Sequence, residues 1–183
     1  MNREFWFAFL TAAVLTVAAL SAAGALVARY AAPPPPERFV SSVFEFDLPK
    51  DWKCIREGTD TVCRSDGSPK SAVCILTMKY RGPNDTPEAY TKHLSLPRQS
   101  KSGDGNIVKS EVVRVGRRWI KGYTWTTGLH FQSEVTNYFT EYLAVVTSHV
   151  AVLVTFSAHK DFLEKHRAEF ETMMSTLRVH QQL

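Results

Sequence analysis

The sequence has 183 residues, of which 22% are charged and 44% hydrophobic, a composition that excludes an intrinsically disordered chain. The formal net charge is +4, with 18 acidic residues among 22 basic ones, so the charge gives no case for a nucleic-acid-binding protein. The chain that follows the first thirty or so residues is long enough for one domain with its own core.

The chain begins with an apolar segment, Phe5 to Ala28, that contains no charged residue. As a helix, its 24 residues would span about 36 Å, enough to cross the roughly 30 Å hydrocarbon core of a membrane. This length favours a retained anchor, because the apolar region of a cleaved signal peptide has only about 7–15 residues. The small residues at Ala23 and Ala25 keep a cleaved signal open as the alternative.

The N-terminal tail before this segment is short, which favours a cytoplasmic tail and an exported domain. We therefore predict a single-pass inner-membrane protein with its domain on the periplasmic or extracytoplasmic side, or a secreted protein if the signal is cleaved. Four consecutive prolines, Pro33 to Pro36, predict a stiff extended spacer. The expected parts are a membrane anchor or signal segment at 1–30, a proline-rich linker at 31–38 and an α/β domain at 39–183.

The first half of the domain shows strand patterns and one helix. Alternating apolar residues predict a strand at Phe44 to Leu48, and an apolar run predicts a second strand at Ser71 to Tyr80. Between them, residues 52–65 predict a hairpin with a two-residue type II′ turn at Gly58-Thr59. A helix is expected after Thr86, which can cap it, and residues 97–106 are expected to form a polar loop.

The second half reads almost entirely as strand until a closing helix. Strands are predicted at 107–115, 119–127, 137–147 and 149–158, and the last is apolar on both faces, so it should lie in the middle of the sheet. Residues 160–179 predict an amphipathic helix. A helix, a run of antiparallel strands and a closing helix together indicate an α+β layered domain.

The three cysteines are Cys54, Cys63 and Cys74. A turn at Gly58-Thr59 places Cys54 opposite Cys63 at a non-hydrogen-bonded pair, where Cα atoms approach to about 4.5 Å, within disulfide range. Export would place the pair in an oxidising compartment. We expect a Cys54–Cys63 disulfide and a buried free thiol at Cys74. A Cys63–Cys74 bridge is the competing pairing, and two facing free thiols are expected if export or the turn is wrong.

Several of these features resemble the PsbP-like superfamily, and they cover about residues 39–179. They are Phe44, Phe46, Leu48, Pro49 and Trp52, the middle helix, the strand ending in LVTFSA and the closing helix ending in STLRV. The superfamily includes a photosystem II extrinsic subunit, a Ran-binding nuclear-import factor and exported bacterial domains, and this chain resembles an exported bacterial member. The resemblance implies an α/β/α sandwich with a central antiparallel sheet, preceded here by the N-terminal transmembrane or signal helix. It also implies a non-catalytic binding or assembly role, and it carries over no functional residue.

The sequence contains none of the short motifs that mark phosphate loops, nucleophile elbows, zinc helices or redox Cys-x-x-Cys pairs. Its six histidines are scattered, and its carboxylates form no close pair suited to acid–base work. We therefore expect no catalytic residue, no cofactor, no metal site and no enzyme activity. An enzyme whose site is assembled from distant residues remains the alternative.

Two groups of residues form a candidate interaction surface. They are the basic residues Arg114, Arg117, Arg118 and Lys121 and the aromatic residues Trp119, Tyr123 and Trp125. The basic group is either a solvated hairpin tip or a contact for anionic lipid or an acidic partner. The aromatic group shares one strand face by period-2 counting, and it forms either core under a helix or an exposed platform for a partner.

The leading functional hypothesis is a membrane-tethered, extracytoplasmic, non-catalytic binding or assembly module. Its expected partner is a protein in or at the membrane rather than nucleic acid, and the oligomeric state is left open. The alternatives are a secreted enzyme with a discontinuous active site and a chaperone-like binder of apolar segments. A deep pocket with converging polar groups would favour the enzyme, a broad shallow patch the module and an open groove the chaperone.

Overall fold

The structure is a computed structural model that describes residues 16, 21, 36–66, 71–101 and 105–180. The predicted membrane segment at 5–28 and most of the proline-rich linker lie outside the described residues. Within the described part of the chain, no helix has the length and apolar character needed to cross a membrane.

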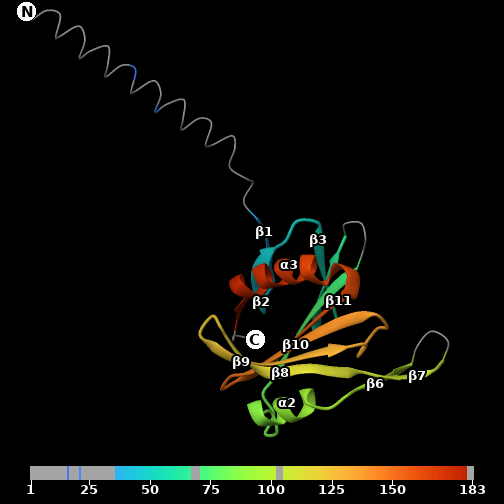
Figure 1. Cartoon of the computed structure of the whole chain (residues 1–183). Helices are drawn as coiled ribbons and strands as arrows, with labels where there is room; N and C mark the ends of the chain where they lie inside the picture. Colours follow the sequence, from blue (N-terminus) through green and yellow to red (C-terminus); the bar gives the residue numbers. More distant parts are fainter. Residues whose placement is uncertain (1–15, 17–20, 22–35, 67–70, 102–104, 181–183) are drawn as a thin grey trace, which may run out of the picture. The chain divides into compact units, whose positions relative to one another are not determined.

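A seven-stranded antiparallel sheet forms the centre of the domain (Figure 1). Its strands in spatial order are β3 (Trp52–Glu57), β4 (Asp60–Ser65), β5 (Ala72–Tyr80), β11 (Val150–His159), β10 (Tyr138–Val146), β9 (Tyr123–Phe131) and β8 (Glu111–Ile120). Two local meanders, β3-β4-β5 and β8-β9-β10-β11, are joined where β5 pairs with β11. The sheet therefore combines two segments of the chain, each of which is connected by short local steps.

Helices cover both faces of this sheet (Figure 1). One face carries α3 (Leu163–Thr176), which follows the 3-10 helix η1 (Lys160–Phe162), together with a small sheet of β1 (Glu37–Val40), β2 (Phe44–Leu48) and β12 (Arg178–Val179). The other face carries α2 (Pro87–Leu94), which contacts β8, β9 and β10. An α+β domain with helix, sheet and helix layers is thereby confirmed.

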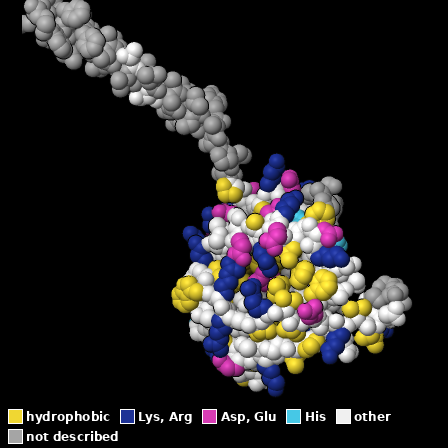
Figure 2. Space-filling view, in the orientation of Figure 1, with side chains coloured by type: hydrophobic (Ala, Val, Ile, Leu, Met, Phe, Trp, Pro, Cys, Tyr) yellow, Lys and Arg dark blue, Asp and Glu magenta, His cyan; other side chains and the backbone are white. Residues whose placement is uncertain are grey.

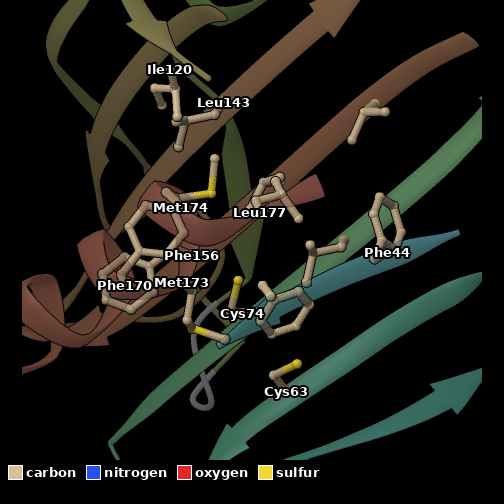
Figure 3. Packing of buried hydrophobic residues seen from close by; sticks show 14 of the residues in the cluster. Phe44, Cys63, Cys74, Ile120, Leu143, Phe156, Phe170, Met173, Met174 and Leu177 are labelled. Carbon is tan, nitrogen blue, oxygen red and sulfur yellow. The ribbon is translucent and has the colours of Figure 1, made fainter. Parts of the chain in front are cut away.

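The main hydrophobic core lies between the large sheet and α3 (Figure 3). Strand alternation directs Cys74 and Phe156, which are opposite each other in β5 and β11, toward α3. The Phe156 ring stacks on Phe170 of α3 with centroids 4.4 Å apart. Met173 and Met174, one turn further along α3, are also buried in this cluster, so α3 packs its apolar stripe on the centre of the sheet.

The helix α2 begins where the sequence predicts, directly after Thr86. The Thr86 hydroxyl accepts a hydrogen bond from the backbone N–H of Ala89 at 3.1 Å, and Pro87 occupies the first helical position. Leu94 in its last turn is buried against β9, where it lies 3.0 Å from the position that a Cβ atom on Gly128 would occupy. Glycine at 128 therefore allows α2 to approach the sheet closely.

The strand β11 lies in the middle of the sheet between β5 and β10, as predicted. Val152, Val154 and Phe156 are buried beneath α3. Leu153 points to the opposite side and is only half-buried. The α2 side of the central strand is thus covered less completely than its apolar sequence predicts.

Several predicted element boundaries are wrong, among them the strand expected at 107–115, which breaks at Ser110, and the helix expected at 160–179, whose last residues form β12. The expected loop at 97–106 contains β6 (Gln99–Lys101), which pairs with β7 (Ile107–Lys109). The expected strand at 119–127 is interrupted, because β8 continues to Ile120 and the chain turns at Lys121-Gly122. Both turn residues have positive φ, 50° and 84°, as a type I′ turn requires. Lysine is an unusual residue for the first of these positions, so the sequence does not indicate a turn here.

The hairpin of β3 and β4 has the predicted register, and the Cys54–Cys63 disulfide is confirmed. Gly58 has a φ of 64°, the positive value that a type II′ turn requires at its first position. Cys54 pairs with Cys63, their Cα atoms are 3.9 Å apart and their sulfurs are bonded. Cys74 is a free, buried cysteine, and burial raises the pKa of its thiol.

We predict that the double variant Cys54→Ser/Cys63→Ser has a free energy of unfolding about 2–3 kcal/mol below that of the oxidised protein, by loop entropy for a loop of about ten residues. Urea unfolding with and without reductant measures it. Reductant should destabilise the wild-type protein and leave the double variant unchanged. Equal stability of the oxidised protein and the variant would contradict a stabilising bridge.

Candidate binding sites on the domain

The three aromatic residues of the predicted surface lie on two different faces. The turn pairs Ile120 with Tyr123 and Trp119 with Thr124, so Tyr123 and Trp125 face the α3 side while Trp119 faces the other. Trp119 is 70% exposed, whereas Trp125 is 2% exposed. The prediction of one shared face is wrong, because period-2 counting does not continue across a turn.

The basic residues lie within β8 rather than at a hairpin tip, except for Lys121 in the turn. Arg118 binds both carboxylate oxygens of Glu171 in α3, one of them at 2.7 Å, while Arg117 contacts Glu88 of α2 at 3.3 Å on the opposite face. These two arginines therefore contact both covering helices from the edge strand. Figure 2 shows Lys and Arg side chains interspersed with Asp and Glu over the visible face.

Glu141 is a buried carboxylate on the α3 side of β10. Burial raises the pKa of Glu141, while Arg167, Arg118 and Arg114 lower it. The predicted basic stretch thus supplies charge to the interior of the domain as well as to its surface.

A cavity of about 380 Å³ lies between the β8–β9 hairpin and the end of α3. Its lining consists of Ile120, Lys121, Tyr123, Trp125, Leu177, Arg178 and Val179. We call it the hairpin cavity. It brings together three of the seven predicted surface residues, Lys121, Tyr123 and Trp125. The sequence does not predict the part of the lining formed by residues 177–179, because these residues fit the end of an amphipathic helix.

A groove of about 340 Å³ lies on the α2 side of the sheet. Its lining consists of Val73, Ile75, Arg98, Glu134, Val135, Tyr138, Tyr142, Leu153, Thr155 and Ser157. We call it the sheet groove. Its floor is formed by β5, β10 and β11, and the half-buried Val73, Ile75 and Leu153 make much of this floor apolar.

One end of the sheet groove carries a network around Arg98. The guanidinium of Arg98 lies 4.4 Å over the ring of Tyr142, and its Nη1 donates to Glu134 at 3.1 Å. Tyr142 donates its hydroxyl hydrogen to the same Glu134 carboxylate, and burial together with Glu134 raises the pKa of Tyr142. Arg98 and Glu134 therefore neutralise each other. The sequence did not reveal this network, because Arg98 lies in a segment read as a polar loop.

His130 is a fully buried histidine between β9 and α2. Its Nε2 donates to the backbone carbonyl of Leu94 at 2.8 Å, and within the described part of the chain its Nδ1 has no hydrogen-bond partner. Burial lowers the pKa of His130, an effect that the hydrogen bond to Leu94 opposes. A neutral imidazole with its proton on Nε2 fits these contacts.

Ser71, His166 and Glu169 form a hydrogen-bonded chain. Ser71 Oγ is 2.7 Å from His166 Nε2, and His166 Nδ1 is 2.7 Å from Glu169 Oε2, which also accepts a bond from Trp52 Nε1 at 2.8 Å. The order serine, histidine and carboxylate is that of a hydrolase triad. Ser71 and His166 are both buried, however, and neither lines the hairpin cavity or the sheet groove. The chain links β3, the start of β5 and α3.

Among the described residues, no group of three or more His, Cys, Asp and Glu side chains could hold a metal ion. No family model matches the sequence, and no curated protein matches it. The fold, in contrast, resembles solved structures. CyanoP, the cyanobacterial PsbP of Synechocystis, has 13% sequence identity and a TM-score of 0.54, covering 81% of this chain and 95% of that one.

Two other structures resemble the chain to a similar degree. LpqN of Mycobacterium tuberculosis, described as involved in cell envelope biogenesis, has 12% identity and a TM-score of 0.54, covering 79% of this chain and 85% of its own. The Ran-binding protein Mog1p of Saccharomyces cerevisiae has 10% identity and a TM-score of 0.51. The match covers 80% of this chain and 97% of Mog1p.

The chain has the PsbP-like fold. At these identities the likeness concerns the fold alone and transfers no functional residue. Within the PsbP-like domain, the sites of interest are therefore those that its own side chains form, namely the hairpin cavity and the sheet groove.

We predict that Arg118 and Glu171 are energetically coupled. A double-mutant cycle with Arg118→Ala and Glu171→Ala should give a coupling free energy of about 0.5–1 kcal/mol, because the contact is bidentate and partly buried. The same cycle with Arg117→Ala and Glu88→Ala is the matched control and should give nearly zero, because both of those side chains are more exposed. Equal coupling of the two pairs in urea unfolding would argue against a specific role for Arg118.

We predict that His130 makes the domain sensitive to acid. Its pKa is lowered in the folded state, so the unfolded chain binds the proton first as the pH falls. The stability that neutral His130 contributes to the fold is complete above about pH 6.5, the pKa of histidine in the unfolded chain. It is lost as the pH falls from there toward the pKa of His130 in the folded protein. The free energy of unfolding should fall more between pH 7 and pH 5 in the wild type than in the His130→Gln variant. His149→Gln is the control, and identical pH dependence of the wild type and His130→Gln would refute this role.

Proposed function

We propose that the chain is an exported, membrane-tethered and non-catalytic binding module that holds a protein partner in the sheet groove. The observation that carries the proposal is the incomplete cover on the α2 side of the large sheet. There Val73, Ile75 and Leu153 are only half-buried at the centre of the domain, although residues on the α3 side of the same strands are fully buried.

Simple dimensions explain the incomplete cover. Seven strands spaced about 4.8 Å apart give a sheet roughly 29 Å wide. A helix is about 10 Å across, and the eight residues of α2 extend over only about 12 Å. One such helix covers the strands that it contacts, β8 to β10, and no other described helix packs on β5 and β11 from this face.

The chemistry of the sheet groove indicates the kind of partner. Its polar end is already neutral, because Arg98 and Glu134 pair with each other. Val135 beside them is 51% exposed, and the floor is largely apolar. A neutral, apolar segment of a protein fits this lining better than a charged one, because a charged segment would lose its hydration without finding an opposite charge.

Export and tethering are supported by the uncharged segment from Phe5 to Ala28 and by the Cys54–Cys63 disulfide, which is typical of oxidising compartments. The PsbP-like neighbours add a precedent, since one of them is a Ran-binding protein and another is described as involved in cell envelope biogenesis. An enzyme has one specific arrangement in its favour, the Ser71–His166–Glu169 chain, but the burial of Ser71 favours a structural role for it.

We predict that the protein remains in the membrane fraction after alkaline carbonate washing, because a helix of 24 uncharged residues spans the hydrocarbon core. Sequencing of the N-terminus of the mature protein provides the second measurement. Release by carbonate, together with a mature N-terminus just after Ala25, would instead identify a secreted protein.

We predict that a photo-cross-linking amino acid at Val135 captures one discrete protein partner in native membranes. The matched control is position 113 on β8, where Val113 is 47% exposed, close to the 51% of Val135. The cross-link at 135 should be lost when Leu153→Lys places a charge in the groove, provided that the variant melts cooperatively.

Three other outcomes would count against the proposed partner. Products of equal yield at 135 and 113 would indicate nonspecific contact. A product that persists in the Leu153→Lys variant would place the partner elsewhere. A broad mixture of products at 135 alone would favour the chaperone-like binder of apolar segments.

A further inference from the structure

The hairpin cavity has an apolar interior and a cationic rim. Ile120, Trp125 and Leu177 in its lining are buried, while Lys121 and Arg178 are exposed. The two cations come from different walls, one from the β8–β9 turn and the other from β12. No acidic side chain belongs to the described lining. The polarity therefore changes from apolar inside to positive outside.

The charge on the rim is not neutralised by the described part of the domain. Glu45 lies opposite Arg178 in the β2–β12 register, but it already contacts Arg38 and His180. Neither Lys121 nor Arg178 forms an ion pair with another described residue. This distinguishes the two cations from Arg117 and Arg118, each of which forms an ion pair with a residue of a covering helix.

The cavity wall also contains an unused hydrogen-bond donor. Trp125 is 2% exposed, and its buried indole Nε1 has no hydrogen-bond partner among the described residues. An indole N–H can only donate, and buried donors in native proteins are nearly always paired. Its burial keeps this N–H out of reach of a molecule in the cavity, whereas other atoms of Trp125 line the cavity.

We propose that the hairpin cavity binds a small amphiphilic anion, an apolar chain that ends in a carboxylate. The apolar chain packs against Ile120, Leu177 and the Trp125 ring, and Lys121 and Arg178 hold the carboxylate. A volume of about 380 Å³ is near the lower end of the roughly 300–1,000 Å³ of ligand pockets, so a single short chain fits and a two-chain lipid does not. The site is separate from the sheet groove and does not depend on the proposed partner.

The test uses the full chain in nanodiscs of zwitterionic lipid, labelled with 5-fluorotryptophan. The chain has four tryptophans, so four ¹⁹F resonances are expected, and Trp125→Phe identifies the one from Trp125. Octanoate should shift the Trp125 resonance saturably. Octylammonium and octanol, which have the same chain with a positive or a neutral head group, should not.

The double variant Lys121→Glu/Arg178→Glu should weaken octanoate binding by about tenfold or more, as expected for the loss of hydrogen bonds to a charged group. The matched control is Lys92→Glu/Lys165→Glu, which reverses two exposed cations outside the cavity. An unchanged Trp52 resonance verifies that both variants keep the fold.

Several results would overturn the proposal. One is an octanoate shift that does not saturate or that octylammonium reproduces. Another is an equal response of the Trp52 and Trp125 resonances, which would indicate general partitioning. A third is unchanged octanoate affinity in the Lys121→Glu/Arg178→Glu variant.

Discussion

The antiparallel pairing of β5 with β11 is the contact on which the rest of the domain depends. It runs from Ala72 opposite Ala158 to Tyr80 opposite Val150, and it joins two meanders that are otherwise local in the chain. On one face this pairing places Cys74 beside Phe156 beneath α3. On the other it places residues of both strands side by side in the floor of the sheet groove. Because it is the most distant pairing in the sheet, we expect it to form late in folding.

The two candidate sites have the same physical origin, since each lies where the layers that cover the sheet end. The sheet groove lies beyond α2, which is too short to cover all the strands. The hairpin cavity lies where α3 ends at Thr176 and the chain continues as β12. Their electrostatics differ, however. Arg98 is neutralised by Glu134 within the groove, whereas Lys121 and Arg178 leave the rim of the cavity positive. The groove therefore fits a neutral protein segment and the cavity a small anion.

Charged side chains of β8 contact both layers that cover the sheet. Arg117 and Arg118 are adjacent in β8 and so point to opposite faces, where each contacts an acidic residue of a different helix. Strand alternation thus converts two adjacent cations into contacts with both layers. It also places cations along an edge strand, a feature that limits pairing with other sheets.

Local physics made part of this structure readable from the sequence. Thr86 with Pro87 sets the start of α2, and the turn at Gly58-Thr59 sets the register that brings Cys54 to Cys63, because capping and turn chemistry act over a few residues. The alternation of apolar and polar residues also predicts the buried face of β2, and the apolar residues on both faces of β11 predict its central place in the sheet. The order of the elements indicates the resemblance to the PsbP-like fold.

The tertiary structure alone decided the candidate sites. The turn at Lys121-Gly122 determined which face Trp119 takes, and burial separated the exposed Trp119 from the buried Trp125. Arg98 meets Tyr142, and Lys121 lies in one cavity with Arg178, only after strands far apart in the sequence have paired. The sequence determines local geometry through interactions between near neighbours, whereas a binding site depends on where the layers stop covering the sheet, which is fixed only by long-range packing.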